Sequence, residues 1–428
     1  MGYCKHLIQT SRIGVAVTAA FLTFSMVTTV SPYSNPRNRA YPGEGFDGVV
    51  RVSYNGASGT GVLLGDGRAV LTAAHLFANG TTEAASVYFE TLAGSQTLAS
   101  SRITLLPDYD RTNGNGDLAL VFLSSFAPVT ANRYTIYRDK DELGKTVVLV
   151  GYGQPGTGDA GTLIGYSGSP LRIKASNQFD IDPALLKSRL GAGMSWTPQA
   201  GTQWLADFDN GSNNQDALGA LAGTWGAGLG QDEGLISPGD SGGPAFINGR
   251  VAGIASYTAR LSQGNLVPDI DSQANSSFGE IAAWQRVSYY QQWLDQNARA
   301  NYPNAPTSAS AVQRTVGEGN SGTTYAYFLL QFTGKRADAS QWLSVDYTTR
   351  NGTAQAGSDY LATSGKLVLY PGETQAVIVV EILGDTLPEP DETFYLDVNS
   401  PVGGSFGPGV VQLTAMRTIT NDDGGFWG

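Results

Sequence analysis

Three short stretches of the chain carry residues that together could catalyse acyl transfer. His75 lies in VLTAAHLF, where a β-rich run ends, and histidine is the side chain best suited to act as a general base near neutral pH. Ser241 lies in ISPGDSGGPAF, and a serine becomes a nucleophile only when a base removes its proton. Asp117 directly precedes the apolar run of NGNGDLALVFL, where a buried carboxylate can orient an imidazole. These residues predict nucleophilic catalysis by a serine.

The neighbours of Ser241 supply the second requirement of this chemistry, which is stabilisation of an oxyanion. Glycines leave backbone N–H groups free of obstruction by a Cβ atom, so the amides of Gly239 and Ser241 can form an oxyanion hole. Asp108 and Asp110 are rivals of Asp117 as the acid, but neither directly precedes the apolar run. Both are interpreted as surface turn residues.

The three stretches resemble a known family. TAAH, DLAL and GDSGGP, in this order, resemble the trypsin/chymotrypsin-like serine peptidases, and GYG at residues 151–153 resembles the glycine-aromatic-glycine turn of that family. The resemblance covers about residues 45–300. It implies two orthogonal β-barrels with the site at their interface and a C-terminal helix. A nucleophile elbow of the α/β-hydrolase type is excluded because no histidine follows Ser241.

The chain also departs from the family pattern. The cysteines that commonly brace the barrels are missing, and His75 and Ser241 are more widely separated than in compact members. In many members a new N-terminus pairs with the acid before the serine, here Asp240, but no activation motif is evident near residues 45–50. A proenzyme that is cleaved before residues 41–48 therefore stays an open alternative.

The resemblance also implies a substrate pocket. It places the pocket base near Leu235 and the pocket wall at Ser256, Tyr257 and Thr258. Without an acid at the base, a preference for Arg or Lys is not expected. The predicted P1 residues are small or medium and apolar.

A second β-rich unit follows residue 311. VDYTT, NGTAQAGSDY, GKLVLYPGET, EPDETF and the closing TITNDD resemble a Calx-beta domain, which implies an immunoglobulin-like β-sandwich. Calcium takes six to eight oxygen ligands, so clustered carboxylates are required to bind it. By resemblance the ligands are Glu318, Asp385, Glu389, Glu392, Asp422 and Asp423. Asn351 and Gly384 stand where stronger binders carry acids, so weak calcium binding, or solvated acidic turns without calcium, are both expected outcomes.

Composition limits the remaining classes of function. The formal net charge of −11 argues against a nucleic-acid partner, which requires a basic face. With 55 glycines and 15% charged residues, the chain favours strands and long loops, so the predicted fold class is mainly β. The only cysteine is Cys4, which excludes an intramolecular disulfide and a cysteine-based zinc site.

The chain divides into six predicted segments. Lys5, His6 and Arg12 precede an apolar run over residues 13–30, which predicts a signal peptide over 1–31, with a membrane anchor as the alternative. The segments that follow are a linker or propeptide remnant over 32–45, a peptidase domain over 46–300, a linker over 301–311, a Calx-beta domain over 312–423 and a tail over 424–428. Within the peptidase domain, strands with extended loops are expected over residues 153–233, and a helix is expected over residues 282–300.

Two functions from different classes follow. The first is a secreted serine endopeptidase, extracellular or periplasmic, with no membrane span after signal removal. It would act on protein or peptide substrates without a catalytic cofactor, and its Calx-beta domain would contact a surface or a protein partner. The alternative is a catalytically inactive, peptidase-like adhesion or binding protein that uses the Calx-beta module.

Overall fold

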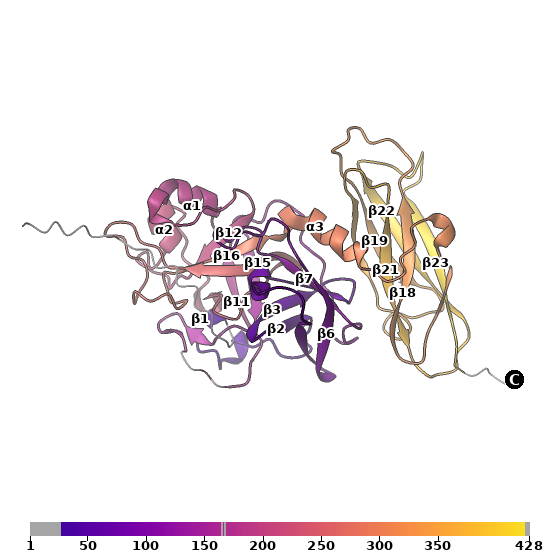
Figure 1. Cartoon of the computed structure of the whole chain (residues 1–428), viewed down its shortest axis with the longest axis horizontal. Coiled ribbons are helices and arrows are strands. Elements are labelled where there is room, and N and C mark those ends of the chain that lie inside the picture. Colours follow the sequence, from indigo (N-terminus) through magenta and orange to yellow (C-terminus); the bar gives the residue numbers. More distant parts are fainter. Residues whose placement is uncertain (1–26, 164–165, 167, 424–428) are drawn as a thin grey trace, which may run out of the picture.

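The computed structural model describes residues 27–163, 166 and 168–423. Strands dominate both of its domains, so the mainly β prediction is confirmed. The two domains lie side by side along the long axis of the molecule, and helix α3 (Val287–Ala300) lies between them (Figure 1). In the described ranges, no helix combines the length and the apolar character that crossing a membrane requires.

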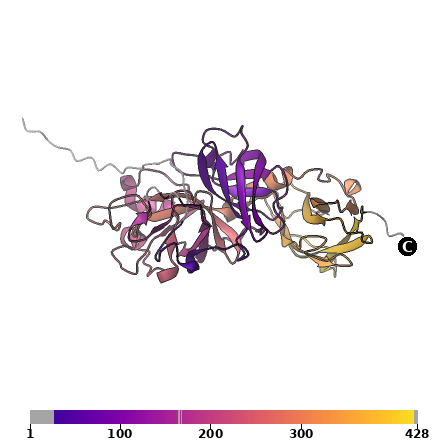
Figure 2. The ribbon, with the colours of Figure 1, turned by 90° about the horizontal axis from the view of Figure 1, so that it is seen from below.

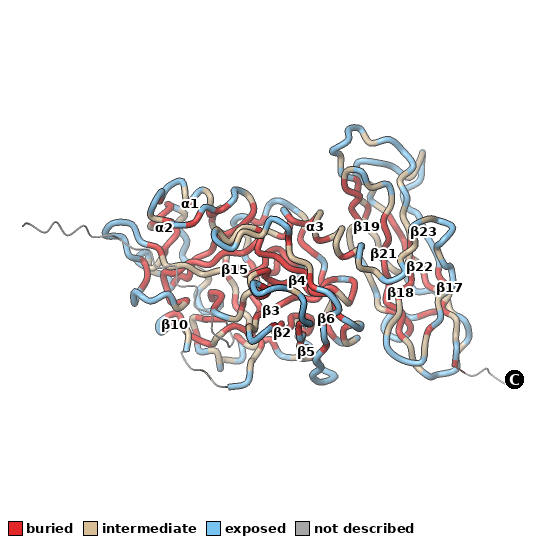
Figure 3. The backbone as a smooth tube through the Cα atoms, viewed as in Figure 1, coloured by how far each residue is buried: buried red, intermediate tan, exposed pale blue. Residues whose placement is uncertain are grey.

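The first half of the peptidase-like domain is a closed barrel with the strand order β2-β3-β4-β7-β6-β5. Its strands alternate with tight turns and bury their apolar side chains inside the barrel. Figure 3 colours much of this half as buried. The strands are β2 (Val49–Tyr54), β3 (Ala57–Leu63), β4 (Ala69–Thr72), β5 (Ser86–Thr91), β6 (Gly94–Leu105) and β7 (Ala119–Leu123).

The second half is a curled six-stranded sheet with the order β11-β8-β14-β15-β16-β12. An antiparallel bridge between Ile181 and Leu205 draws its two edges toward each other. This half is the counterpart of the second predicted barrel. Its strands are β8 (Thr146–Gly151), β11 (Ile173–Gln178), β12 (Gln203–Asp207), β14 (Pro244–Ile247), β15 (Arg250–Ala259) and β16 (Ile281–Arg286).

The predicted helix over residues 282–300 is correct only from Val287 onward. Residues 281–286 form strand β16, which pairs with β12 on one side and β15 on the other. Trp284 is fully buried in that strand, whereas Val287, Tyr290 and Leu294 pack against the core from helix α3. The aromatic at 284 fits the helical spacing by coincidence, because a strand buried on both faces also carries large apolar residues.

Residues 153–233 contain more regular structure than the expected strands and loops. Helix α1 (Pro183–Leu190) begins at Asp182, whose side chain accepts a hydrogen bond from the amide of Ala184. Helix α2 (Ala217–Ala222) begins at Asp216 in the same way. Apolar residues of both helices pack on β12 and β16, so these loops have a small core of their own.

The N-terminal segment departs from the predicted boundaries. The predicted signal peptide lies outside the described residues up to position 26, but Val27 and strand β1 (Thr28–Thr29) are buried in the domain. Strand β1 lies between β13 (Gly234–Leu235) and β9 (Gly156–Thr157), and β10 (Gly161–Thr162) completes this small sheet.

Residues 32–45, interpreted as a linker or propeptide remnant, pack on the domain. The buried Asn38 side chain donates to Thr29 Oγ1 and to Ser31, which ties this segment to β1. A fully buried ion pair between Arg172 and Asp47 (2.7 Å) closes the end of the segment onto the second sheet. A backbone whose polar groups are satisfied in this way belongs to the folded unit.

The C-terminal domain is a β-sandwich, as the Calx-beta resemblance predicts. A five-stranded sheet of order β17-β23-β22-β19-β20 packs on the pair β18-β21. The strands are β17 (Thr315–Gly317), β18 (Gly322–Gln331), β19 (Leu343–Asn351), β20 (Ser364–Leu369), β21 (Gln375–Gly384), β22 (Glu392–Val402) and β23 (Gln412–Thr420).

The closed barrel lies against the sandwich, and the second sheet lies farther away (Figure 2). Arg133 makes a bidentate pair with the buried Glu381 (2.9 and 2.8 Å), and the hydroxyl of Tyr325 donates to the carbonyl of Asp66. Gly67 has a positive φ of 70°, and a Cβ atom there would lie 2.3 Å from the Glu381 carboxylate. The barrel therefore approaches the sandwich closely at this turn.

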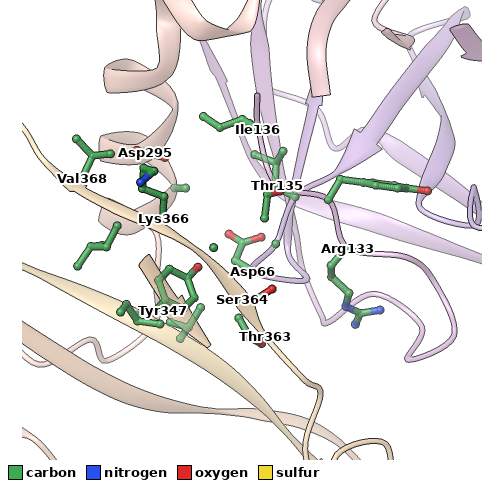
Figure 4. A pocket seen from close by; sticks show the side chains of 18 of the residues that line it. Asp66, Arg133, Thr135, Ile136, Asp295, Tyr347, Thr363, Ser364, Lys366 and Val368 are labelled. Carbon is green, nitrogen blue, oxygen red and sulfur yellow. The ribbon is translucent and has the colours of Figure 1, made fainter. Parts of the chain in front are cut away.

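A cavity of about 740 Å³ lies beside this joint. Asp66, Arg133 and Thr135 line it from the barrel, and Tyr347 and Lys366 line it from the sandwich (Figure 4). None of His75, Asp117 and Ser241 borders this cavity. It is a feature of the domain interface and not of the predicted catalytic site.

Candidate active site

The structure brings the three predicted catalytic residues together at hydrogen-bond distance. His75 lies on the short helix that follows β4 in the closed barrel, and Ser241 lies in the loop before β14 in the second sheet. His75 Nε2 is 2.7 Å from Ser241 Oγ, and His75 Nδ1 is 2.7 Å from Asp117 Oδ2. The site thus forms where the two halves of the domain meet.

Asp117 is held on both of its carboxylate oxygens. Oδ1 accepts a hydrogen bond from the backbone amide of His75 (2.8 Å), and Oδ2 also accepts one from Ser256 Oγ (2.6 Å). The side chain is 2% exposed, so these bonds replace the water that a carboxylate would otherwise bind. A second, backbone contact to His75 fixes the acid and the imidazole as one unit.

Charge explains the ionisation of this pair. Burial lowers the pKa of His75, but the charge of Asp117 and the hydrogen bond to it outweigh burial, so the pKa is raised above its usual value. Burial raises the pKa of Asp117, while His75 and Ser256 lower it by more, so the net pKa falls below the ordinary value for aspartate. The ionised carboxylate therefore stabilises the imidazolium that forms when His75 takes up a proton.

The loop before Ser241 presents two free amides. Gly239 has φ 97°, a conformation open to glycine, and its carbonyl accepts a hydrogen bond from Thr60 Oγ1. In the described part of the chain, the amides of Gly239 and Ser241 donate to no protein acceptor. Both therefore remain able to donate to a developing oxyanion, as the sequence predicts.

Asp240 anchors that loop from inside. Its carboxylate accepts hydrogen bonds from the amides of Gly153 (2.6 Å) and Ser237 (2.8 Å). Among the described residues no cation forms an ion pair with Asp240. Burial raises its pKa to about 7 against the lowering effect of these hydrogen bonds. The backbone around GYG and GDSGG is thus joined through one buried acid.

The predicted pocket residues fall into different roles. Leu235 has no exposed surface and lies in a hydrophobic cluster, so its side chain belongs to the core and offers no surface to a substrate. Ser256 was predicted on the pocket wall, but its hydroxyl binds Asp117, which is a positioning role. Tyr257 and Thr258 are half-buried on β15, and the Tyr257 hydroxyl donates to Gln203 and accepts from Trp196. These two residues remain the predicted wall.

One of the two rival acids, Asp110, lies in a surface turn, as interpreted from the sequence. Asp110 accepts hydrogen bonds from Thr112 and Asn113 in a surface turn and does not contact His75. The role of Ser256 could not be read from the sequence, because the strand pattern around it indicates only that a serine lies in a buried strand. Its neighbour across the fold, Asp117, is 139 residues away.

The Calx-beta acids also gather at one end of the sandwich. Carboxylate oxygens of Asp359, Glu389 and Glu392 lie within 4.8 Å of one another. Burial and the charges of Asp385, Glu389, Asp423 and Asp359 raise the pKa of Glu318 to about 7. Asp359 was missed in the sequence, although GSDY places an acid beside a turn. Asp422 accepts from the amide of Gly319, at the edge of the cluster.

Comparisons with known proteins agree with this division. A family model described as Trypsin matches residues 37–172, and a model described as Calx-beta domain matches residues 315–423. The first match includes His75 and Asp117 but ends before Ser241. The sequence resemblance to both families, stated on short motifs, is confirmed by these matches.

Several curated proteins are similar over about a fifth of this chain. Sodium/calcium exchanger 2 of Homo sapiens is 38% identical over 108 residues, 22% of this chain and 12% of the exchanger. Sodium/calcium exchanger Calx of Drosophila melanogaster is 37% identical over 89 residues (21% and 9%), and adhesion G-protein coupled receptor V1 of Danio rerio is 38% identical over 106 residues (23% and 2%). The chain thus spans about a tenth or less of the length of these relatives. What these comparisons and the fold establish is that this chain carries a trypsin-family domain followed by a Calx-beta domain.

Proposed function

We propose that the chain is a secreted serine endopeptidase that hydrolyses peptide bonds through an acyl-enzyme. The observation that carries the proposal is the continuous chain of hydrogen bonds from Ser241 Oγ through His75 to Asp117, with 2.7 Å at each step of the side chains.

Acylation follows from this geometry. Ser241 Oγ attacks the scissile carbonyl carbon while His75 Nε2 takes the hydroxyl proton, and Asp117 stabilises the resulting imidazolium. The carbonyl oxygen becomes an oxyanion that the amides of Gly239 and Ser241 can bind. Collapse of this intermediate breaks the C–N bond, and the imidazolium gives its proton to the leaving amine, which leaves an ester on Ser241.

Deacylation uses the same groups with water as the nucleophile. His75 Nε2 takes a proton from water, the hydroxide attacks the ester carbon, and Ser241 Oγ leaves with the proton from the imidazolium. The products are the acid and the free enzyme. Every proton transfer passes through one nitrogen atom, so the raised pKa of His75 sets the lower pH limit of both steps.

Specificity is proposed for small or apolar P1 residues. Tyr257 and Thr258 offer an aromatic and a β-branched wall on β15, and neither carries a charge. A panel of chromogenic peptides that differ only at P1 tests this proposal. Preference for Arg or Lys would contradict it.

Labelling with a fluorophosphonate probe tests the proposed activity. The purified protein should be labelled, whereas Ser241→Ala and His75→Ala should not, because the probe reacts only with an activated serine. Asp110→Asn, which alters an acid outside the triad, is the matched control and should be labelled like wild type. Absence of labelling before and after limited proteolysis would favour the inactive binding protein.

Secretion is proposed on the N-terminal sequence. The basic start and the apolar run over residues 13–30 are typical of a signal peptide. Because β1 is part of the folded domain, the cleavage that fits the fold lies before Val27 and not at residue 31. N-terminal sequencing of the exported protein tests this position.

Calcium binding by the Calx-beta domain is proposed as well. The donor set fits, since Asp359, Glu389 and Glu392 supply only oxygen ligands and Asp423 Oδ2 is buried without a hydrogen-bond partner. Among the similar proteins, those named sodium/calcium exchangers carry calcium in their names. In this chain a bound ion would order the loop ends of the sandwich. Calorimetric titration that shows no heat up to millimolar calcium would contradict this proposal.

A further inference from the structure

The peptidase domain holds a second group of acids, away from the triad. Asp207 ends strand β12, Asp209 follows it, and Asp216 begins helix α2. The three residues are 4%, 7% and 1% exposed, and one carboxylate oxygen of each lies within 4.8 Å of the other two. The sequence motif DFDNGSNNQD that carries them has no role in the proposed peptide hydrolysis.

Backbone amides hold these carboxylates in place. Asp207 Oδ2 accepts from the amide of Leu218, and Asp216 accepts from the amides of Gly219 and Gly226. Glu233 accepts from the amide of Asp209 through Oε1, so it joins the cluster to the segment before β13. The acids are thus directed toward one point by the fold and not by chance packing.

One atom of the cluster is left without a partner. Asp209 is more than nine-tenths buried, its carboxylate belongs to the 4.8 Å group, and its Oδ1 has no hydrogen-bond partner. A buried carboxylate oxygen that receives no hydrogen bond from the protein is unfavourable. This atom points to a ligand that the polypeptide does not supply.

The charges around the cluster also indicate a missing cation. Glu233, Asp216 and Asp180 lie close enough to act on Asp209 as neighbouring negative charges. In the described ranges, no Lys, Arg or His forms an ion pair with any of the five acids. Buried charges are normally paired with a cation or with a metal.

We propose that Asp207, Asp209 and Asp216 bind a divalent cation, and that the cation is Ca²⁺. The group contains only oxygen donors, which calcium prefers, and it lacks the nitrogen or sulfur ligands of a zinc site. Main-chain carbonyls and waters would complete the coordination. The site closes the loop between β12 and β13, and β13 leads directly into the Ser237–Ser241 loop.

Calcium titration of the full two-domain protein, stripped with a chelator, tests the proposal. The comparison needs wild type, Asp209→Asn, and the double variant Glu389→Gln/Glu392→Gln, which removes two of the three clustered acids of the sandwich. Asp209→Asn is the informative change because it keeps the side-chain shape, and the Asp209 carboxylate accepts no hydrogen bond from the described residues. Calorimetry and terbium luminescence count the ions, and the melting temperature is measured with calcium and with EDTA.

The expected results separate this site from the sandwich. The double variant should retain one bound ion, and Asp209→Asn should lose one ion relative to wild type. Calcium should raise the melting temperature of the double variant by at least about 3 °C, because a ligand that binds only the folded state stabilises it. In EDTA, Asp209→Asn should melt at or above wild type, since one of the mutually repelling charges is gone.

Two results would overturn the proposal. One is a double variant that binds no calcium up to about 10 mM, well above the dissociation constants of extracellular calcium modules. The other is an Asp209→Asn protein that binds as many ions as wild type. If Asp209→Asn does not fold, the ion count of the double variant alone decides, because its peptidase domain is unchanged.

Discussion

At the scale of single residues, the position of Ser256 shows how Asp117, the acid of the proposed triad, is held. Its hydroxyl donates to Asp117 Oδ2 at 2.6 Å, and the Gln285 amide donates to Ser256 in turn (3.3 Å). Asp117 therefore keeps the rotamer that faces His75 without help from solvent. Ser256 acts through Asp117 and does not contact the reacting atoms.

Replacing Ser256 with Ala should lower kcat/KM by about 10- to 100-fold. A hydrogen bond to a buried charge contributes about 1.5–3 kcal/mol, and about 1.4 kcal/mol corresponds to a tenfold change in rate. The loss of a donor leaves more negative charge on Asp117 to act on His75, so the acid limb of the pH profile should move to higher pH. Steady-state kinetics across that limb measures both effects.

The matched control for this change is Ser100→Ala. Ser100 is also a buried serine and accepts a hydrogen bond from the amide of Ala85, but it lies in the barrel away from the triad. Removing the Ser100 hydroxyl should lower the free energy of unfolding and leave kcat/KM unchanged. Equal losses of activity in the two variants would show that Ser256 has no positioning role.

The pH dependence of activity should report His75. Hydrolysis needs the neutral imidazole, so kcat/KM should fall as pH decreases through the raised pKa of His75. The contribution of the His75–Asp117 pair to the free energy of unfolding changes with pH in the opposite direction to kcat/KM. It is complete below the ordinary histidine pKa of about 6.5 and is lost as pH rises through the raised value.

Asp117→Asn separates the charge from the geometry. The amide keeps the shape but removes the charge that raises the pKa of His75, so the acid limb should move to lower pH. The rate itself should fall by about 10⁴-fold, because the imidazole is no longer held in the productive tautomer. An unchanged acid limb would show that another group sets the profile.

Much of this residue-scale picture could be predicted from the sequence, because each triad member sits in a short contiguous motif. His75, Asp117 and Ser241 needed no knowledge of the fold. Ser256, Leu235 and Asp359 did, since the meaning of each depends on which strand it faces. A single strand pattern predicts burial but not the partner across the sheet.

At the scale of elements, strand β1 changes the meaning of the N-terminal segment. It pairs with β13 through Thr28 and Leu235, and the Thr28 hydroxyl donates to the Leu235 carbonyl at 3.1 Å. The sequence pattern placed this strand inside an apolar run that also reads as the end of a signal peptide. Two residues of strand carry too little periodicity to be separated from such a run.

A chain that begins at Pro32 should be less stable than one that begins at Val27. The truncation removes the buried Val27 side chain, the pairing of β1, and three acceptors of the Asn38 side chain. The combined loss is about 3 kcal/mol or more, which lowers the melting temperature by roughly 6–12 °C. Differential scanning fluorimetry of the two chains measures this shift.

Asn38→Ala in the longer chain is the control for that truncation. It removes the side-chain bonds but keeps β1, so its melting temperature should lie between those of the two chains. Identical melting of all three proteins would mean that residues 27–31 contribute nothing to the folded domain. The helix boundary was predicted less well for a related reason, since β16 ends at Arg286 and α3 begins at Val287 with no turn residue between them.

At the scale of the whole molecule, the joint between the domains is polar but largely closed to solvent. Arg133 and Glu381 are 13% and 4% exposed, and Phe126 packs edge-on to Tyr325 with ring centroids 4.7 Å apart. On the other side of the joint, Tyr370 donates to Asp295 of α3. The sequence contains no motif that predicts this joint, because Arg133 and Glu381 are 248 residues apart.

Glu381→Ala should weaken the joint by about 3 kcal/mol, because it leaves the Arg133 guanidinium partly buried and unpaired. Scanning calorimetry should then resolve separate unfolding transitions for the two domains, and activity at Ser241 should not change. Asp232→Ala, which breaks the exposed pair with Arg37, is the control and should change stability by less than about 1 kcal/mol. A single transition of unchanged enthalpy in Glu381→Ala would contradict the coupling.

The same joint bears on the distance between Ser241 and whatever the sandwich binds. The Arg133–Glu381 ion pair and helix α3, which lies between the domains, hold the two domains in contact. With the sandwich on a surface, as proposed, this joint would set the distance and the angle between Ser241 and that surface. Cleavage would be selected by where a bond stands above that surface as much as by its sequence.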